Sequence, residues 1–235
     1  MFDKTRPRSG NRSPENFSRR GPQQRAQSAA ANRVRQLRRA VCEESARILA
    51  EEGARDYQRA KRKACERLGV DPNIGLPRNS EIAQAVAARL RLFQADTLEI
   101  RYRRHLESVL HGMDLLQRFS PRAVGTLLDG FVTAQTPVQI HVFSPTPEEV
   151  HASLNGQGVP FELHDKRYRF GRNRHRLVSG LRFIVNEIAV EVSVFLDQYG
   201  FDPPRCPING RAMRRASAMR IQELLAEIRQ ADENR

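Results

Sequence analysis

The sequence predicts an α+β protein: an N-terminal helical region, then a small mixed sheet with flanking helices. Two observations carry this prediction. Apolar residues recur at helical spacing in four segments between residues 32 and 118. From residue 138 to 196, short stretches alternate apolar and polar residues, which is typical of strands with one buried face.

Four helices are predicted in the first half of the chain. They cover residues 32–53, 54–69, 80–93 and 97–118. Gly53 and Gly69 follow the first two and are typical C-cap residues. Ser120 and Pro121 predict the N-cap and first turn of a further short helix, "SPRAVGTLLDG", before the first strand.

The second half predicts alternating strands and helices. After a strand at 138–143, Thr146 and Glu149 have the spacing of a capping box, which predicts a helix start. The stretch "VPFELHDKRYRF" predicts two strands with a turn near 164–166. Asn186-Glu187 then divides "LRFIVNEIAVEVSVF" into two more strands.

Composition divides the chain into four regions. They are a basic arm expected to be disordered (1–31), a helical region (32–118), an α/β region (119–200), and an irregular loop with a C-terminal helix (201–235). The net charge is +13, and residues 1–40 hold eleven Lys or Arg against two acidic residues. Such an arm attracts phosphate backbones without reading sequence. The alternative is a tail that only increases solubility. Ser217 is the predicted N-cap of the last helix.

Several classes of protein are disfavoured by composition. Hydrophobic residues make up 39% of the 235 residues, enough for a core, but no run is long enough for a membrane helix. The N-terminus has no apolar signal region, so we expect a cytoplasmic protein without a membrane partner. Cys42, Cys65 and Cys206 are too far apart in sequence for typical metal or disulfide spacing.

Two of the predicted strands have similar sequences. "VQIHVF" (138–143) and "VEVSVF" (190–195) share the pattern Val, polar, aliphatic, polar, Val, Phe. If the two are neighbours in one sheet, their polar residues lie on one face. Those residues are Gln139, His141, Glu191 and Ser193.

These positions resemble the nucleotidyltransferase superfamily in a minimal form. In that family a glycine element precedes a strand with two carboxylates two positions apart, and a third carboxylate lies on a later strand. Here Gly125 and Thr126 stand at the glycine element, and twelve residues separate Thr126 from Gln139. Gln139 and His141 occupy the paired positions, and Glu191 matches the third.

The resemblance extends over residues 34–220. Uncharacterised bacterial proteins with a nucleotidyltransferase-like domain have segments similar to "DYQRAKRKACERLG", "GVPFE" and "RCPINGRAMRRAS". The resemblance implies the nucleotidyltransferase fold, and nucleotide contacts at Gly125 and Thr126.

The family's activity implies two Mg²⁺ ions held by the carboxylates. Gln139 offers only a neutral oxygen, His141 a nitrogen, and Glu191 one carboxylate, so the metal site looks disabled. Mg²⁺ is therefore expected only if activity survives. Glu162 or Asp129 could replace the missing ligands. Alternatively His141 and Glu191 form an acid–base pair, or a purely structural pair.

A basic segment at 165–182 is the other candidate site. It predicts a hairpin and loop that contact nucleotide or RNA phosphates, with aromatics available for stacking. The candidate residues are Lys166, Arg167, Arg169, Arg172, Arg174 and Arg176. Alternatively, Tyr168 and Phe170 are core residues, and the arginines simply alternate outward.

Three functions follow from these patterns. The first is a catalytically degenerate nucleotidyltransferase-fold protein that binds a nucleotide, RNA or a ribonucleoprotein. The second is an active nucleotidyltransferase with substituted ligands. The third is a protein–protein adaptor that uses the helical half of the chain.

Overall fold

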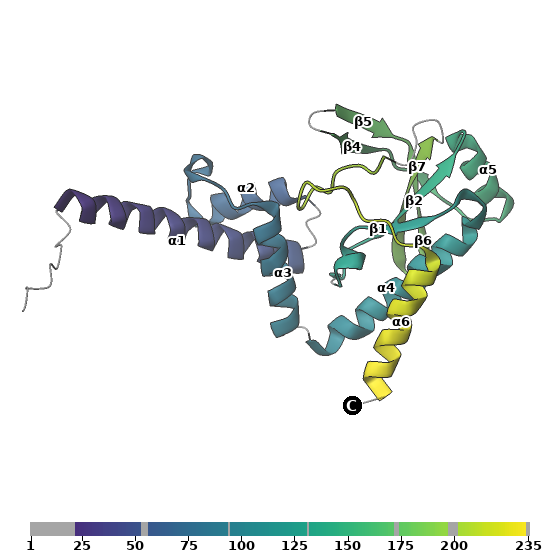
Figure 1. Cartoon of the computed structure of the whole chain (residues 1–235), viewed down its shortest axis with the longest axis horizontal. Helices are drawn as coiled ribbons and strands as arrows, with labels where there is room; N and C mark the ends of the chain where they lie inside the picture. Colours follow the sequence, from purple (N-terminus) through teal and green to yellow (C-terminus); the bar gives the residue numbers. More distant parts are fainter. Residues whose placement is uncertain are drawn as a thin grey trace, which may run out of the picture.

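The computed structural model describes residues 22–52, 56–93, 95–130, 132–171, 174–196 and 202–233 (Figure 1). The α-helices are α1 (Pro22–Glu51), α2 (Tyr57–Leu68), α3 (Asn79–Phe93), α4 (Ala95–Leu115), α5 (Pro147–Gly156) and α6 (Ala218–Glu233). The strands are β1 (Arg122–Val124), β2 (Val138–Ser144), β3 (Glu162–Leu163), β4 (Lys166–Phe170), β5 (Arg174–Val178), β6 (Gly180–Val185) and β7 (Ile188–Leu196). The predicted α+β class is confirmed.

Helices α1, α2 and α3 form a bundle with a core of its own. Its buried residues include Val41, Ile48, Ile82 and Leu90, which lie on the predicted apolar stripes. Gly69 caps α2 in the left-handed conformation, with φ of 61°, as predicted. Gly53 lies outside the described residues.

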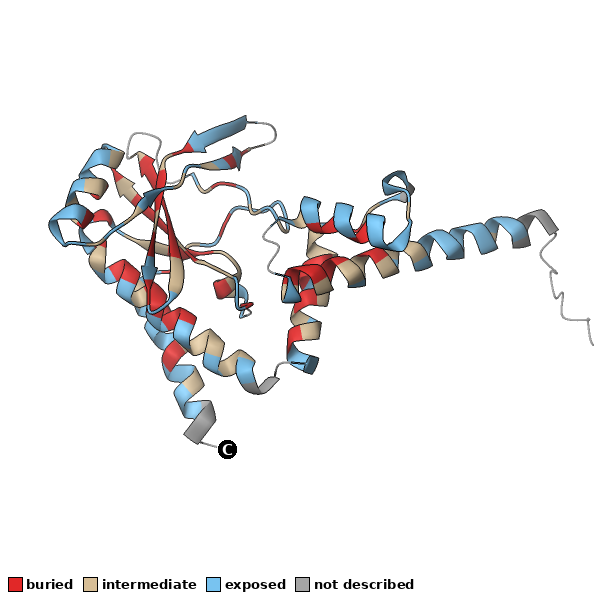
Figure 2. Ribbon diagram, turned by 180° about the vertical axis from the view of Figure 1, so that it is seen from behind, coloured by how far each residue is buried: buried red, intermediate tan, exposed pale blue. Residues whose placement is uncertain are grey.

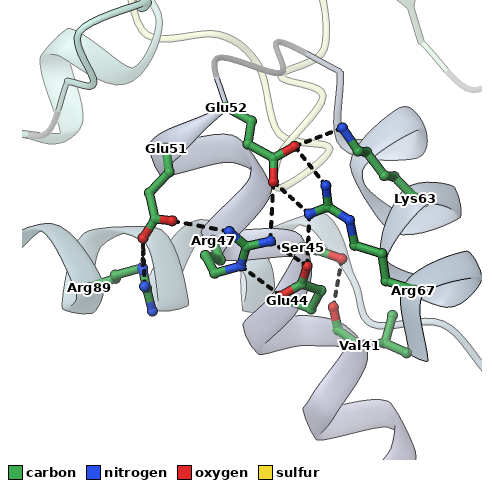
Figure 3. Close-up of polar contacts among 9 residues, drawn as sticks. All are labelled: Val41, Glu44, Ser45, Arg47, Glu51, Glu52, Lys63, Arg67 and Arg89. Atoms are coloured by element: carbon green, nitrogen blue, oxygen red, sulfur yellow. Dashed lines mark hydrogen bonds and ion pairs between the residues drawn. The ribbon is translucent and has the colours of Figure 1, made fainter.

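An ionic cluster joins the three helices of this bundle (Figure 3). Glu44 of α1 and Glu52, the residue that follows α1, both bind Arg67 of α2, at 3.0 and 2.5 Å. Arg47 bridges Glu44 and Glu51, and Glu51 reaches Arg89 of α3 at 2.6 Å. Hydrogen bonds from these cations lower the pKa of Glu44 and of Glu52 to about 2.

The start of α1 differs from the predicted arm. Residues 1–21 lie outside the described residues, whereas 22–31 form the first turns of α1. This stretch contains Ala26 and three consecutive alanines at 29–31, the strongest helix formers, which explains the earlier start. The first half of α1 is mostly exposed and extends beyond the bundle (Figures 1 and 2).

The five-stranded sheet is mixed, as predicted. Its order is β1-β2-β7-β6-β3, with β2 and β7 parallel and the other pairs antiparallel. Strands β4 and β5 form a separate antiparallel hairpin. The predicted turn at 186–187 is confirmed: Asn186 and Glu187 have φ of 49° and 65°, as a tight two-residue hairpin turn requires.

Helices cover one face of this sheet and the β4–β5 hairpin covers part of the other. The apolar face carries Val138, Ile140 and Val192, which pack in one core with α4, α5 and α6. Gly112 of α4 allows the helix to approach, since a Cβ there would lie 3.0 Å from Ile140. By packing, α4 and α6 therefore belong with the sheet, although the sequence placed them in separate regions.

The structure differs from the prediction at two helix starts. Ser120 is not an N-cap: Arg122–Val124 is a strand, because it pairs with β2. The helical turn there is a 3-10 helix at Thr126–Asp129 instead. Thr146 does occupy the N-cap of α5, but its side chain makes no capping bond. Glu149 accepts a hydrogen bond from Ser144 Oγ, at 3.4 Å.

The C-terminal segment before α6 is irregular, as predicted, and connects several elements. Asn79 of α3 donates to Pro207 O at 2.8 Å, and Ala216 pairs with Ala123 of β1. Ser217 Oγ accepts from Arg220 N at 3.4 Å, in agreement with its predicted capping role. No helix among the described residues is long and apolar enough to cross a membrane.

Candidate functional site

The two similar stretches, 138–143 and 190–195, lie on β2 and β7 and are paired residue by residue. Gln139 lies opposite Glu191, and His141 lies opposite Ser193, across the parallel β2–β7 pair. The predicted clustering of these four residues on one face is confirmed. The same face continues onto β6 and β3, where Arg182 lies opposite Glu191 and Glu162 lies opposite Arg182.

His141 is fully buried under the β4–β5 hairpin. Its Nε2 lies 3.1 Å from Tyr168 Oη, and that oxygen lies 2.9 Å from Ser193 Oγ. On the other side of the ring, Arg215 Nε donates to His141 Nδ1 at 3.3 Å. Two residues from outside the five-stranded sheet, Tyr168 and Arg215, therefore hold the imidazole in place.

Burial determines the protonation state of His141. Desolvation, followed by the positive charges of Arg215 and Lys166, holds its pKa well below 6.5. The ring is therefore neutral at pH 7. Because Nδ1 accepts from Arg215, Nε2 carries the proton and donates to Tyr168, which can then donate to Ser193.

The expected pairing of His141 with Glu191 is wrong. The strand register places Ser193, not Glu191, opposite His141, and the hydrogen bonds of the ring go to Tyr168 and Arg215. A carboxylate partner would raise the pKa of the imidazole, whereas burial and neighbouring cations lower it. The described hydrogen-bond partners of the His141 ring are thus a hydroxyl and a guanidinium group.

Aromatic rings complete the cover over this part of the sheet. The Phe195 ring lies 4.5 Å from the His141 ring and 5.6 Å from the Tyr168 ring, measured between centroids. Arg215 lies over Phe143 and Phe195, at 5.0 and 5.2 Å from their centroids. The half of the face that holds His141 is therefore a second small core and not an open cleft.

Glu191 is also engaged. Its Oε2 accepts from Gln139 Nε2 at 3.4 Å and lies 3.5 Å from Lys166 Nζ. Its Oε1 lies 3.8 Å from His164 Nε2. With only 8% of its side chain exposed, Glu191 is compensated by the ammonium group of Lys166.

These residues do not fit a two-magnesium site. Mg²⁺ prefers several carboxylate and water oxygens, and the only carboxylate here is paired with a lysine. The two proposed replacements do not complete the site: Asp129 forms an ion pair with Arg214, and Glu162, on the same face of the sheet, is exposed and lies two strands away from Glu191. Within the described ranges, no group of three His, Cys, Asp or Glu side chains is arranged to hold a metal ion.

Gly125 lies between β1 and the 3-10 helix and beside Gln139 of β2, whereas the resemblance implies a short helix before the glycine. Gly125 has φ of 89°, in the left-handed region, and a Cβ there would lie 3.0 Å from Gln139 Oε1. Thr126 begins the 3-10 helix and is partly exposed. Two surface pockets, of about 480 and 400 Å³, border α4, and neither is lined by Gly125, Thr126 or Gln139.

The basic segment forms the β4–β5 hairpin. Tyr168 and Phe170 are buried, with 5% and 8% exposure, so the interpretation of these aromatics as core residues is confirmed. Arg176 lies over the Phe170 ring at 5.7 Å, and Lys166 is partly buried beside Glu191. Arg172 lies outside the described residues.

Four arginines of this hairpin are exposed, and a second segment adds two more. Arg205 N donates to Arg169 O at 2.7 Å, which attaches the 202–216 segment to the edge of β4. Arg211 lies nearby, since Arg205 pairs with Ala212 and the position of a Gly210 Cβ is 3.5 Å from the Arg169 guanidinium. We call the following set the basic surface: Arg167, Arg169, Arg174, Arg176, Arg205 and Arg211.

Sequence reasoning missed Arg205 and Arg211. They lie more than 25 residues from the hairpin, and only the fold brings the two segments together. The signal present in the sequence was the density of arginines in "RCPINGRAMRR", which was interpreted only as a fixed loop. Within the described part of the chain, Arg167, Arg169, Arg174, Arg205 and Arg211 form no ion pair.

Comparison of the chain with protein-family models, with curated proteins and with solved structures finds no match. The likeness to nucleotidyltransferases therefore rests on the sequence motifs alone.

Proposed function

We propose that the protein binds RNA through the basic surface, on a nucleotidyltransferase-like scaffold that has lost its metal site. The observation that carries the proposal is the density of exposed arginines on the β4–β5 hairpin, where Arg167 and Arg169 lie on the outer face and two more lie on the other, and on the segment attached to it. Exposed arginines in such an array are suited to phosphate contacts, since each guanidinium can donate two parallel hydrogen bonds to one phosphate.

Local charge supports this surface over others on the chain. Residues 165–182 contain seven Lys or Arg and a single acidic residue, Asp165. Four arginines of α1 and α2 differ, because Arg38, Arg39, Arg47 and Arg67 are engaged by glutamates. The other five arginines of the basic surface, all except Arg176, form no ion pair within the described residues, so positive charge is concentrated there.

The contacts made by Gln139, His141 and Glu191 support the proposed loss of catalysis. Gln139, His141 and Glu191 lie at adjacent positions of two parallel strands, as the resemblance requires. Lys166 occupies the neighbourhood of the one carboxylate, and Tyr168 covers the imidazole. A transferase would instead need carboxylates open to metal and nucleotide.

Charge reversal tests the proposal. Binding of the full-length chain to a fluorescein-labelled RNA is measured by anisotropy across a salt series. We expect Arg167→Glu/Arg169→Glu to weaken binding by about tenfold or more, because two phosphate contacts become repulsive. Glutamate is preferred to alanine because it keeps a charged side chain on this exposed two-stranded hairpin, and charge protects such hairpins from edge-to-edge aggregation.

The matched control is Arg59→Glu/Arg62→Glu. Both arginines are exposed on α2, and the double substitution makes the same change in net charge. We expect it to weaken binding by less than about twofold. Equal losses in the two variants, or no RNA binding by the unmodified protein at low salt, would refute the proposal.

A protein-binding role for the helical half is the second candidate. Leu92, Phe93 and Ile100, around the junction of α3 and α4, are 78%, 71% and 56% exposed. Exposed apolar clusters of this kind mark interaction sites. Recovery of one stoichiometric protein partner after nuclease treatment, lost in Leu92→Ser/Phe93→Ser, would favour this role.

A further inference from the structure

On the premise of the proposed function, we infer that the RNA bound is single-stranded and lies on the outer face of the β4–β5 hairpin. Two arginines on that face bind its phosphates, and an imidazole ring and a leucine contact its bases. The four residues are Arg167, Arg169, His175 and Leu177.

The two faces of the hairpin differ in composition. Tyr168 and Phe170 of β4 turn inward, into the second small core, so the residues that alternate with them face outward. Each outward arginine lies opposite a residue of β5 that can contact a base. The cross-strand pairs of the outer face are Arg169 with His175 and Arg167 with Leu177.

The two β5 residues of this face are available to a ligand, on a hairpin that is largely exposed (Figure 2). His175 is exposed, and within the described part of the chain its side chain makes no hydrogen bond, ion pair or ring contact. Leu177 is 70% exposed, whereas the next residue, Val178, is buried in the second small core. Neither side chain is therefore used to hold the hairpin on the sheet.

The pair of Arg169 and His175 combines a phosphate contact with a base contact. Side chains directly opposite each other in an antiparallel pair have Cβ atoms about 5 Å apart. A guanidinium can donate two parallel hydrogen bonds to one phosphate. Histidine is among the side chains on which unpaired RNA bases stack. A nucleotide with its phosphate at Arg169 therefore has its base within reach of the imidazole ring.

Arg167 and Leu177 repeat this arrangement one step along the hairpin. Residues two positions apart on a strand are separated by about 7 Å, so the two arginines can hold two different phosphates. A base that covers Leu177 removes apolar surface from water, which favours binding. The outer face thus offers two positions, each with a cation and a contact for a base.

A single strand makes use of both kinds of contact. In a duplex the bases are paired and stacked on each other, so their flat faces are covered and only the backbones would meet the hairpin. An unpaired strand presents phosphates and base faces together, which is how single-strand binding surfaces gain affinity. The ring and the leucine therefore favour single-stranded RNA over a duplex.

Arg174 provides a control on the same hairpin. It is exposed, as Arg169 is, but the register pairs it with Phe170 and so places it on the inner face. Arg174→Glu and Arg169→Glu make the same change in net charge. A larger loss of binding in Arg169→Glu therefore reports a contact on the outer face and not the overall charge.

The test uses the full-length chain and measures anisotropy at low salt with three labelled RNA probes of about 20 nucleotides. They are oligo(U), the same strand without its bases, and oligo(U) paired with oligo(A). We expect oligo(U) to bind about fivefold or more tightly than the abasic strand, and more tightly than the duplex, because its bases contribute. Arg169→Glu should weaken oligo(U) binding by about fivefold or more, and Arg174→Glu by less than about twofold.

Substitution of the ring separates stacking from charge. His175→Ala should weaken binding of oligo(U) by about fivefold and leave binding of the abasic strand within about twofold. His175→Phe, which keeps a ring without a nitrogen, should restore the affinity for oligo(U). The abasic strand, measured on the same protein, distinguishes a lost contact from a lost fold.

The outcomes separate the two proposals. Equal affinity for oligo(U) and the abasic strand, or tighter binding of the duplex, would overturn the single-strand inference and leave RNA binding by the arginines intact. The same holds if His175→Ala leaves the affinity for oligo(U) unchanged or weakens all probes equally, or if Arg169→Glu and Arg174→Glu cause equal losses. Failure of all three probes to bind at the lowest salt would overturn both the inference and the proposed function.

Discussion

Gln139 and Glu191 lie opposite each other on two parallel strands, and Gln139 Nε2 donates to Glu191 Oε2 at 3.4 Å. An amide and a carboxylate thus form a hydrogen-bonded pair at two positions to which the sequence resemblance assigns carboxylates. Lys166 then supplies the positive charge, 3.5 Å from Glu191. The polar side chains on this face of the sheet therefore satisfy one another's hydrogen bonds and charges without a metal ion.

The Tyr168 hydroxyl is expected to contribute to stability. In Tyr168→Phe, His141 Nε2 and Ser193 Oγ lose their common partner while remaining buried, at a cost of about 1–3 kcal/mol. Urea unfolding measures the change. In Tyr168→Phe/Ser193→Ala the second orphaned group is gone, so the double variant should be less destabilised than the sum of the singles. Additive losses would show that the hydroxyl bridge carries no coupling.

Stability is expected to decrease as the pH falls below about 6.5. Burial lowers the pKa of His141 and of His105 in the folded protein, whereas in the unfolded chain each returns to about 6.5. Below that pH the unfolded state binds protons that the folded state does not, so unfolding becomes more favourable. Each histidine adds up to about 1.4 kcal/mol per pH unit in this window.

Urea titrations at pH 7.5 and 5.5 test this dependence. His141→Asn, which cannot take up a proton, should show a smaller difference between the two pH values than the unmodified protein. His111→Asn is the control, because His111 is exposed on α4 and its loss should leave the difference unchanged. An unchanged pH dependence in His141→Asn would show that this imidazole is not the origin of the effect.

Gly180 is expected to tolerate no side chain. A Cβ at this position would lie 2.5 Å from Val192 O and 2.6 Å from His164 O, both backbone atoms that cannot move aside alone. Gly180→Ala should therefore destabilise the protein by about 2 kcal/mol or more. Gly156→Ala is the control: nothing lies within 4 Å, and the residue is helical, so stability should stay the same or rise. Thermal unfolding that ranks the two variants otherwise would contradict this packing.

Glu44 is expected to contribute more to thermal stability than its neighbour Glu43. Glu44 binds Arg47 and Arg67 and joins α1 to α2, whereas Glu43 pairs only with the exposed Arg39 of its own helix. Glu44→Gln should therefore lower the Tm more than Glu43→Gln. The pKa of Glu44 is lowered to about 2, so its contribution is present above pH 4.5 and declines as the pH falls toward 2. Equal Tm values for the two variants, measured by circular dichroism, would show that the ion pairs of Glu44 between α1 and α2 do not stabilise the protein.

The helices and the central sheet could be predicted because their signals are local. Helical periodicity located α2, α3 and α4 closely, and the similarity of two six-residue stretches correctly placed the polar residues of β2 and β7 on one face. The start at Ser120 was wrong because three residues of β1 became a strand only through pairing with β2. Nothing local in Arg122–Val124 indicates that partner.

The candidate site was predictable only in part. The sequence placed His141 and Glu191 on one face, but not the hairpin that covers one and the lysine that compensates the other. Those contacts join residues far apart in the chain. For the same reason, Arg215 could not be connected to His141, which lies 74 residues earlier.

The pairing of β2 with β7 also has a consequence for the order of folding. Paired residues of these two strands, such as Gln139 and Glu191, are 52 positions apart in the sequence, whereas β6 and β7 are joined by the two-residue turn at 186–187. Closing the longer loop costs more chain entropy, so we expect the β6–β7 hairpin to form first and β2 to dock on it later. Until then, the edge of β7 that will receive β2 is open. During synthesis on the ribosome, β2 must therefore wait for the last strand of its own sheet to emerge.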